Sequence, residues 1–106
     1  MSLVVFEDLL NDVKTEMHKF TFDELLRKCR EVLGIRAYNA AEFMGITAPR
    51  LKSLELGNFT GMPARHELQM LEKIYGIDQE IWKTKAQDFL KENVAGKRVR
   101  RKYGAN

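Results

Sequence analysis

The stretch from Gly45 to Gly57 constrains the fold of this chain more than any other, because it reads as a tight turn followed by a short helix. Gly45 can end a preceding helix, since glycine adopts the left-handed conformation without a steric penalty. Thr47 can cap the next helix with its hydroxyl group. Pro49 is tolerated there because the first turn of a helix has no intrahelical N–H bonds to lose. The pattern predicts a helix over residues 48–56.

This predicted helix has only a thin apolar stripe. Leu51 and Leu54 are three positions apart and face one side of the helix. Such a helix is held against the fold on one side and leaves its other side available, as a recognition helix does in a DNA groove. The available side holds Pro49, Lys52, Ser53 and Leu56, with Ala48 and Arg50 at its edges.

Elsewhere, apolar residues recur at helical spacing and no segment alternates with a period of two, so we predict an all-α fold. The predicted helices cover residues 3–19, about 21–33, 37–44, 48–56, about 64–75 and about 79–92. Thr21 and Glu24 form the pattern of a capping box at the start of the second helix. The first helix is expected to bury Phe6, Leu9, Leu10, Val13 and Met17.

Composition excludes several classes of protein. At 106 residues, with 44% hydrophobic and 31% charged residues, the chain is expected to form one globular domain. It has no apolar run that could span a bilayer and no signal peptide, which favours the cytoplasm and no membrane partner. Cys29 is the single cysteine, so it forms no internal disulfide and no multi-cysteine zinc site, and we expect it to be buried.

The sequence also lacks the patterns of catalysis and cofactor binding. His18 and His66 are far apart and have no partners at ligand spacing, so no metal site or cofactor is expected. No nucleophile–base pair, paired catalytic carboxylates or phosphate-binding loop is visible, so we do not expect an enzyme.

The positive charge is concentrated at the C-terminus. The net charge is +3, yet residues 95–106 contain five basic residues and no acid, and the rest of the chain holds 13 basic and 15 acidic residues. This tail is expected to be flexible and to add nucleic-acid contacts if the domain binds DNA. The basic residues of the tail are Lys97, Arg98, Arg100, Arg101 and Lys102.

A longer series of positions follows a known pattern: Leu26, Arg30, Gly34, Ala41, Gly45, Ile46, Thr47, Leu51, Leu54, Glu55, Gly57, Pro63, Leu68, Leu71, Gly76 and Ile77. In these positions the segment from Thr21 to about Leu90 resembles the Cro/C1-type (XRE-like) helix-turn-helix domains of phage and bacterial repressors. The resemblance implies a five-helix, lambda-repressor-like domain at 21–93, in which helices 37–44 and 48–56 are the DNA-reading pair. Residues 1–20 are then an extra amphipathic helix, and residues 94–106 are the basic tail.

The resemblance also implies roles for individual residues. An internal pair between Arg30 and Glu55 is expected to tie the first helix of the domain to the recognition helix. The positions that usually read base edges are Ala48, Pro49, Lys52 and Ser53. Phosphate contacts are expected from Arg36, Arg50, Asn58, Thr60 and Arg65.

Four positions depart from the family pattern. Ala48 and Pro49 can make only apolar contacts with bases, Leu56 replaces a residue that is commonly polar, and Ala37 replaces a phosphate-steadying glutamine. Two functions therefore stay open. The first is a transcriptional regulator, a repressor that binds double-stranded DNA. The alternative is a protein-interaction adaptor, or an antitoxin-like protein that holds a protein partner through its N-terminal helix or tail.

The resemblance further implies a homodimer. Its interface would come from helix 3–19 or helix 79–92, because an exposed apolar stripe of that size favours association.

Overall fold

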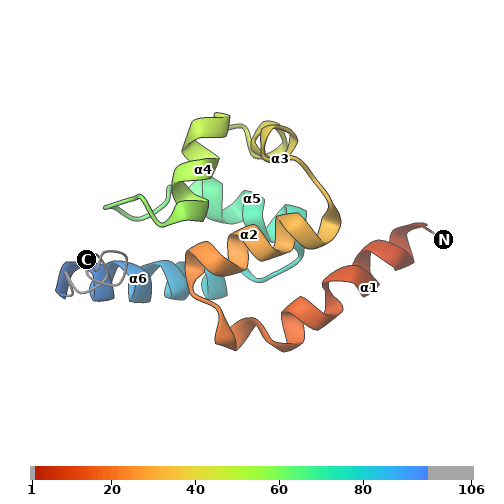
Figure 1. The fold of residues 1–106 in the computed structure, drawn as a ribbon, viewed down its shortest axis with the longest axis horizontal. Coiled ribbons are helices and arrows are strands. Elements are labelled where there is room, and N and C mark those ends of the chain that lie inside the picture. The colour runs from red at the N-terminus through yellow and green to blue at the C-terminus, as the bar shows by residue number, and fades with distance from the viewer. Residues whose placement is uncertain (1, 96–106) are drawn as a thin grey trace.

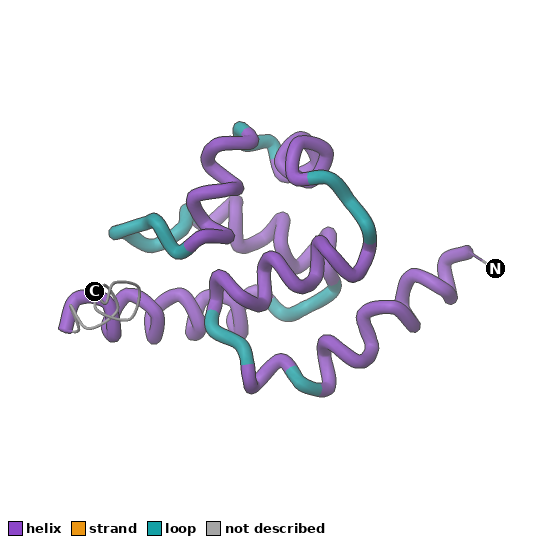
Figure 2. The backbone as a smooth tube through the Cα atoms, viewed as in Figure 1, coloured by secondary structure: helices purple, strands orange, loops and turns teal. Residues whose placement is uncertain are grey.

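The computed structural model describes residues 2–95, and the side chains of residues 9–93, as helices joined by loops (Figure 1, Figure 2). In chain order the elements are α1 (Ser2–Thr15), the 3-10 helix η1 (Met17–Lys19), α2 (Phe22–Leu33), α3 (Ala37–Met44), α4 (Ala48–Leu56), α5 (Arg65–Tyr75) and α6 (Gln79–Ala95). No strand occurs within residues 2–95, so the all-α prediction is confirmed over that range.

Helix α2 lies in the middle of the fold. It packs against α1 on one side and against α4 on the other, and the start of α6 also contacts it (Figure 1). Helix α3 contacts both α4 and α5, and α5 contacts α6. The α3–α4 pair therefore lies on the opposite side of α2 from α1.

The start of α2 is fixed by local hydrogen bonds. The Thr21 N–H donates to the Glu24 carboxylate at 3.1 Å, which is one half of the expected capping box, whereas the Thr21 hydroxyl donates to Asp23 at 2.5 Å. Because its first turn is fixed, α2 presents one face to the core. The fully buried side chains of this face are Phe22, Leu25, Leu26 and Cys29.

An aromatic cluster fills the core between α2 and α6. The rings of Phe22 and Trp82 lie edge to face, with centroids 5.7 Å apart, and both side chains are fully buried. Phe59, from the loop after α4, meets Phe22 at 5.4 Å and stacks on Phe89 at 4.9 Å. This loop is therefore anchored to the core through a side chain that the sequence pattern did not identify.

The N-terminal helix differs from the prediction of one continuous helix over 3–19. Helix α1 ends at Thr15, whose hydroxyl donates to the Asn11 carbonyl at 2.9 Å, and the chain then tightens into η1. This change of direction brings the chain back along α2. Leu9, expected in the core, is 42% exposed, because adjacent helical residues are 100° apart and Leu10 takes the inward position.

Candidate nucleic-acid interface

The turn between α3 and α4 has the predicted local structure, and both helices have the predicted bounds. Gly45 has a φ of 73°, which favours glycine, and its N–H donates to the Glu42 carbonyl at 3.1 Å. At the start of α4 the Thr47 hydroxyl oxygen accepts from the Arg50 N–H at 3.2 Å. The angle between the helices is therefore set by a glycine stop followed directly by a threonine cap.

Helix α4 is anchored on one side only. Leu51 and Leu54 are fully buried beneath it. On the opposite side Pro49, Lys52 and Leu56 are exposed, and Leu56 keeps 54% of its surface open to solvent. The outward face of α4 is hereafter these three residues together with Ala48 and Ser53, which are half-buried at its edges.

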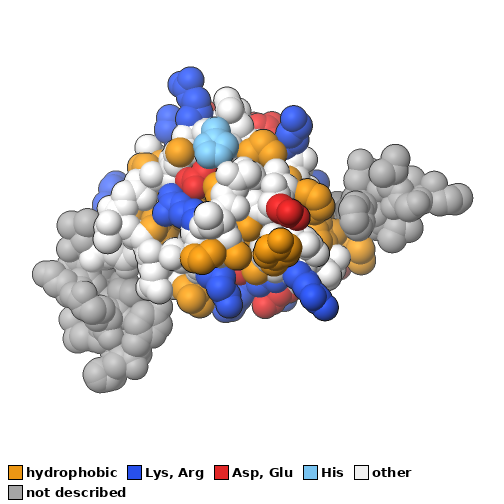
Figure 3. All heavy atoms as spheres, turned by 90° about the horizontal axis from the view of Figure 1, so that it is seen from above, with side chains coloured by type: hydrophobic (Ala, Val, Ile, Leu, Met, Phe, Trp, Pro, Cys, Tyr) orange, Lys and Arg blue, Asp and Glu red, His pale blue; other side chains and the backbone are white. Residues whose placement is uncertain are grey.

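Figure 3 looks onto the α3–α4 side of the molecule. Lys and Arg side chains lie mostly around the margin of this side, with hydrophobic side chains between them. The surface is therefore mixed rather than uniformly basic.

A bidentate ion pair ties α4 to α2. The Arg30 guanidinium donates to the two oxygens of Glu55 at 2.7 and 2.9 Å, and a third hydrogen bond reaches the Ile35 carbonyl at 2.9 Å. The Glu55 side chain is only 4% exposed. Hydrogen bonding to Glu55 raises the pKa of Arg30, and burial opposes it. This is the pair that the resemblance implies, and it uses both carboxylate oxygens of the only acid on α4.

Arg50, expected to contact phosphate, has a different partner. Its guanidinium donates two hydrogen bonds of 3.0 Å to the Glu67 carboxylate on α5. The hydrogen bonds to Glu67 raise the pKa of Arg50, and burial opposes them. The guanidinium thus gives two of its five N–H donors to a partner within the protein, and its contact with phosphate stays a prediction that rests on the others.

The other four expected phosphate contacts are exposed. Arg36 is the residue at the N-terminus of α3 and makes no side-chain capping bond. Asn58 and Thr60 lie in the loop after α4, and Arg65 is the first residue of α5. These residues flank α4 in the chain and leave their polar groups available. The tail residues Lys97, Arg98, Arg100, Arg101 and Lys102 lie outside the described residues.

Two features of this region were not anticipated. Glu67 is buried, and its Oε1 also accepts from the Ala64 N–H at 2.8 Å. A glutamate three residues after a helix cap is the signal that could have identified it. Tyr38 and Phe43 on α3 are 65% and 59% exposed, although aromatic residues on a short helix are usually assigned to the core.

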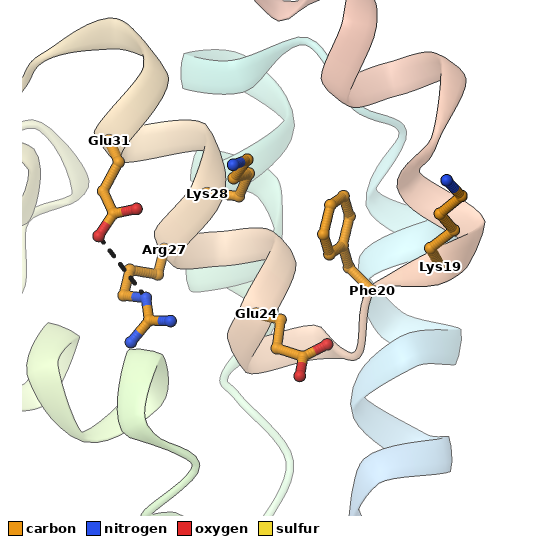
Figure 4. A pocket seen from close by; sticks show the side chains of 6 residues that line it. All are labelled: Lys19, Phe20, Glu24, Arg27, Lys28 and Glu31. Atoms are coloured by element: carbon orange, nitrogen blue, oxygen red, sulfur yellow. Dashed lines mark ion pairs between the residues drawn. The ribbon is translucent and has the colours of Figure 1, made fainter.

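Two of the open hollows in the described part of the chain are lined by no residue of α4. One of them has a volume of about 370 Å³ and lies between η1 and α2. It is lined by Lys19, Phe20, Glu24, Arg27, Lys28 and Glu31 (Figure 4). Its charges of opposite sign lie close together, with Arg27 Nε 3.7 Å from Glu31. The other, of about 510 Å³, lies between the start of α5 and α6. Neither has the nucleophile and base of an active site.

Within the described part of the chain, no three His, Cys, Asp or Glu side chains are grouped so that they could hold a metal ion. None of the helices in that part is long and apolar enough to cross a membrane. Comparisons with protein-family models, with curated proteins and with solved structures give no match to this chain.

Proposed function

We propose that the protein is a DNA-binding transcriptional regulator, acting as a repressor, in which α3, the turn at Gly45 and α4 serve as a helix-turn-helix. One observation carries the proposal: α4 is fixed on its inner side by Leu51 and Leu54 and presents Lys52 outward. A short, rigidly held helix with an open face fits the major groove.

The charges around α4 support this function. Glu55 and Glu67 are the buried acids of the region, and each is paired with an arginine. Lys52, Arg36 and Arg65 make no ion pair with any described residue. Unpaired cations beside neutralised acids favour a polyanion such as double-stranded DNA.

A homodimer on a two-fold operator is part of the proposal. An operator with two half-sites one helical turn apart requires two copies of α4 on one face. Helix α1 offers a further apolar residue for such an interface, because Leu9 remains exposed. A solution mass equal to one chain, both alone and on DNA, would remove the dimer from the proposal.

Fluorescence anisotropy with random-sequence duplexes at low salt tests DNA binding. We expect the double variant Lys52→Glu, Arg36→Glu to lose at least about tenfold in affinity, and its salt slope to fall by about one for each lost phosphate contact. The double variant Lys28→Glu, Lys19→Glu is the charge-matched control, because both lysines line the hollow between η1 and α2 (Figure 4). Equal losses in both variants, or no salt-sensitive binding by the unaltered protein, would overturn the proposal.

The exposed aromatic residues favour a second candidate, a protein-interaction adaptor or antitoxin-like protein. Tyr38 and Phe43 on α3, with Leu56 and Met62, are large hydrophobic side chains left at the surface. A partner that buries them would be released by Tyr38→Ser with Phe43→Ser and would be indifferent to Lys52→Glu. If the protein binds DNA, Lys52→Glu should weaken binding more than Tyr38→Ser with Phe43→Ser.

A further inference from the structure

The outward face of α4 offers donors and apolar groups to a ligand but no dedicated acceptor. Ala48, Pro49 and Leu56 are apolar, and the Lys52 ammonium only donates. Ser53 is half-buried, and its hydroxyl is the one group of this face that can both donate and accept.

The one carboxylate of α4, that of Glu55, does not supply the missing acceptor. Glu55 is 5% exposed, and Arg30 occupies both of its oxygens. It therefore cannot reach out to accept from a base without breaking a buried ion pair.

These groups also have a fixed order along the helix. Pro49 and Leu56 are seven residues apart, so they lie within about 20° of one line and about 10.5 Å apart. Lys52 and Ser53 lie between them. The resulting order, apolar, then cationic, then apolar, covers a length of roughly three base steps at about 3.4 Å each.

The major-groove edges of the four bases respond differently to such a surface. Cytosine presents an amino group that needs an acceptor, and adenine presents such an amino group beside a single acceptor. Guanine presents two acceptors, and thymine presents a methyl group and one acceptor. We infer, resting on the proposed function, that α4 recognises DNA through thymine methyl groups packed on Pro49 and Leu56, flanking a guanine that accepts from Lys52. The binding site is then a short strand in which thymines flank a guanine.

Uracil substitution tests this inference without altering the protein. Duplexes would first be selected by the full chain from a random pool, and each thymine of a selected duplex would then be replaced by deoxyuridine, which lacks only the methyl group. Burial of one methyl corresponds to about a fourfold change in affinity, so we expect about that loss at each contacted thymine. Equal affinity for the thymine and uracil duplexes would overturn the inference.

A variant of the protein assigns the effect to α4. Leu56→Ser should abolish the uracil effect at one thymine, whereas Met62→Ser, an exposed hydrophobic residue outside α4, should retain it. Retention of every uracil effect in both Leu56→Ser and Pro49→Ser would overturn the assignment. DNA binding that ignores the methyl groups contradicts this inference alone, and the absence of DNA binding contradicts the proposed function with it.

Discussion

Arg50 and Glu67 join the first turn of α4 to the first turn of α5 through two parallel hydrogen bonds of 3.0 Å. The Glu67 side chain is 6% exposed and the Arg50 side chain is 36% exposed, so the pair lies at the boundary between core and solvent. The same carboxylate accepts from the Ala64 N–H. One buried acid therefore fixes both the start of α4 and the start of α5.

Glu67→Gln is expected to lower the free energy of unfolding by about 1–2 kcal/mol. The amide loses the charge that strengthens the bonds from Arg50, and the partly open position of Arg50 limits the loss. Urea denaturation followed by circular dichroism measures the change. Glu31→Gln is the control, because Glu31 pairs at 3.7 Å with Arg27 on an exposed surface, and the expected change is below about 0.5 kcal/mol. Equal changes in the two variants would contradict this account of the Arg50–Glu67 pair.

The same pair predicts how stability depends on pH. Burial alone would raise the pKa of Glu67, but the hydrogen bonds from Arg50 and Ala64 and the charge of Arg50 outweigh it and lower that pKa below its ordinary value of 4.5. Because the folded-state pKa is depressed, the contribution is fully present above pH 4.5 and is lost as the pH falls through the lower folded-state value. Urea midpoints measured across this acid range should fall less steeply for Glu67→Gln than for the unaltered protein. Parallel curves would contradict the prediction.

The α3–α4 unit shows what could be predicted from the sequence. Gly45, Thr47 and Gly57 act through their own backbone conformation or through bonds to residues three or four positions away, so the helix bounds followed directly. The assignment of Arg50 to phosphate had no such local basis. Its partner Glu67 is 17 positions away, and only the packing of α5 beside α3 brings the two together.

Two core positions could not be predicted from the sequence for the same reason. Periodicity places Leu9 and Leu10 on neighbouring sides of one helix but does not say which side meets α2, and the structure buries Leu10. Phe59 lies in a loop, where no periodicity applies, yet it stacks on Phe89 of α6. Contacts between segments distant in the chain decide these positions, and helical spacing carries no information about them.

Cys29 is expected to be inert in the folded protein. Burial raises the pKa of this thiol to about 12, only partly opposed by the charge of Lys14, and the side chain is fully buried. At a pH of about 8.5, where a free cysteine is half ionised, a disulfide reagent should not label the native chain. In denaturing urea it should label one thiol per chain. Rapid labelling without urea would contradict the packing of α2.

Gly57→Ala is expected to be the most damaging substitution among the helix-ending glycines. Gly57 has a φ of 77°, a conformation that costs an alanine about 1–2 kcal/mol. An added Cβ would also lie 2.9 Å from the Phe89 ring and 3.2 Å from an Asp23 carboxylate oxygen. Phe89 stacks on Phe59 and cannot move without disturbing the core, so we expect a further loss of about 1–3 kcal/mol.

Gly34→Ala separates the two contributions to this loss. Gly34 has a φ of 70° and ends α2, but a Cβ there meets no atom within 4 Å. It should therefore show the conformational cost alone in the same urea denaturation experiment. If both variants lose the same stability, the close approach of Phe89 to Gly57 carries no energetic weight. If Gly57→Ala loses more, the loop after α4 is held by α6, and α4 owes part of its orientation to the contact between Gly57 and Phe89.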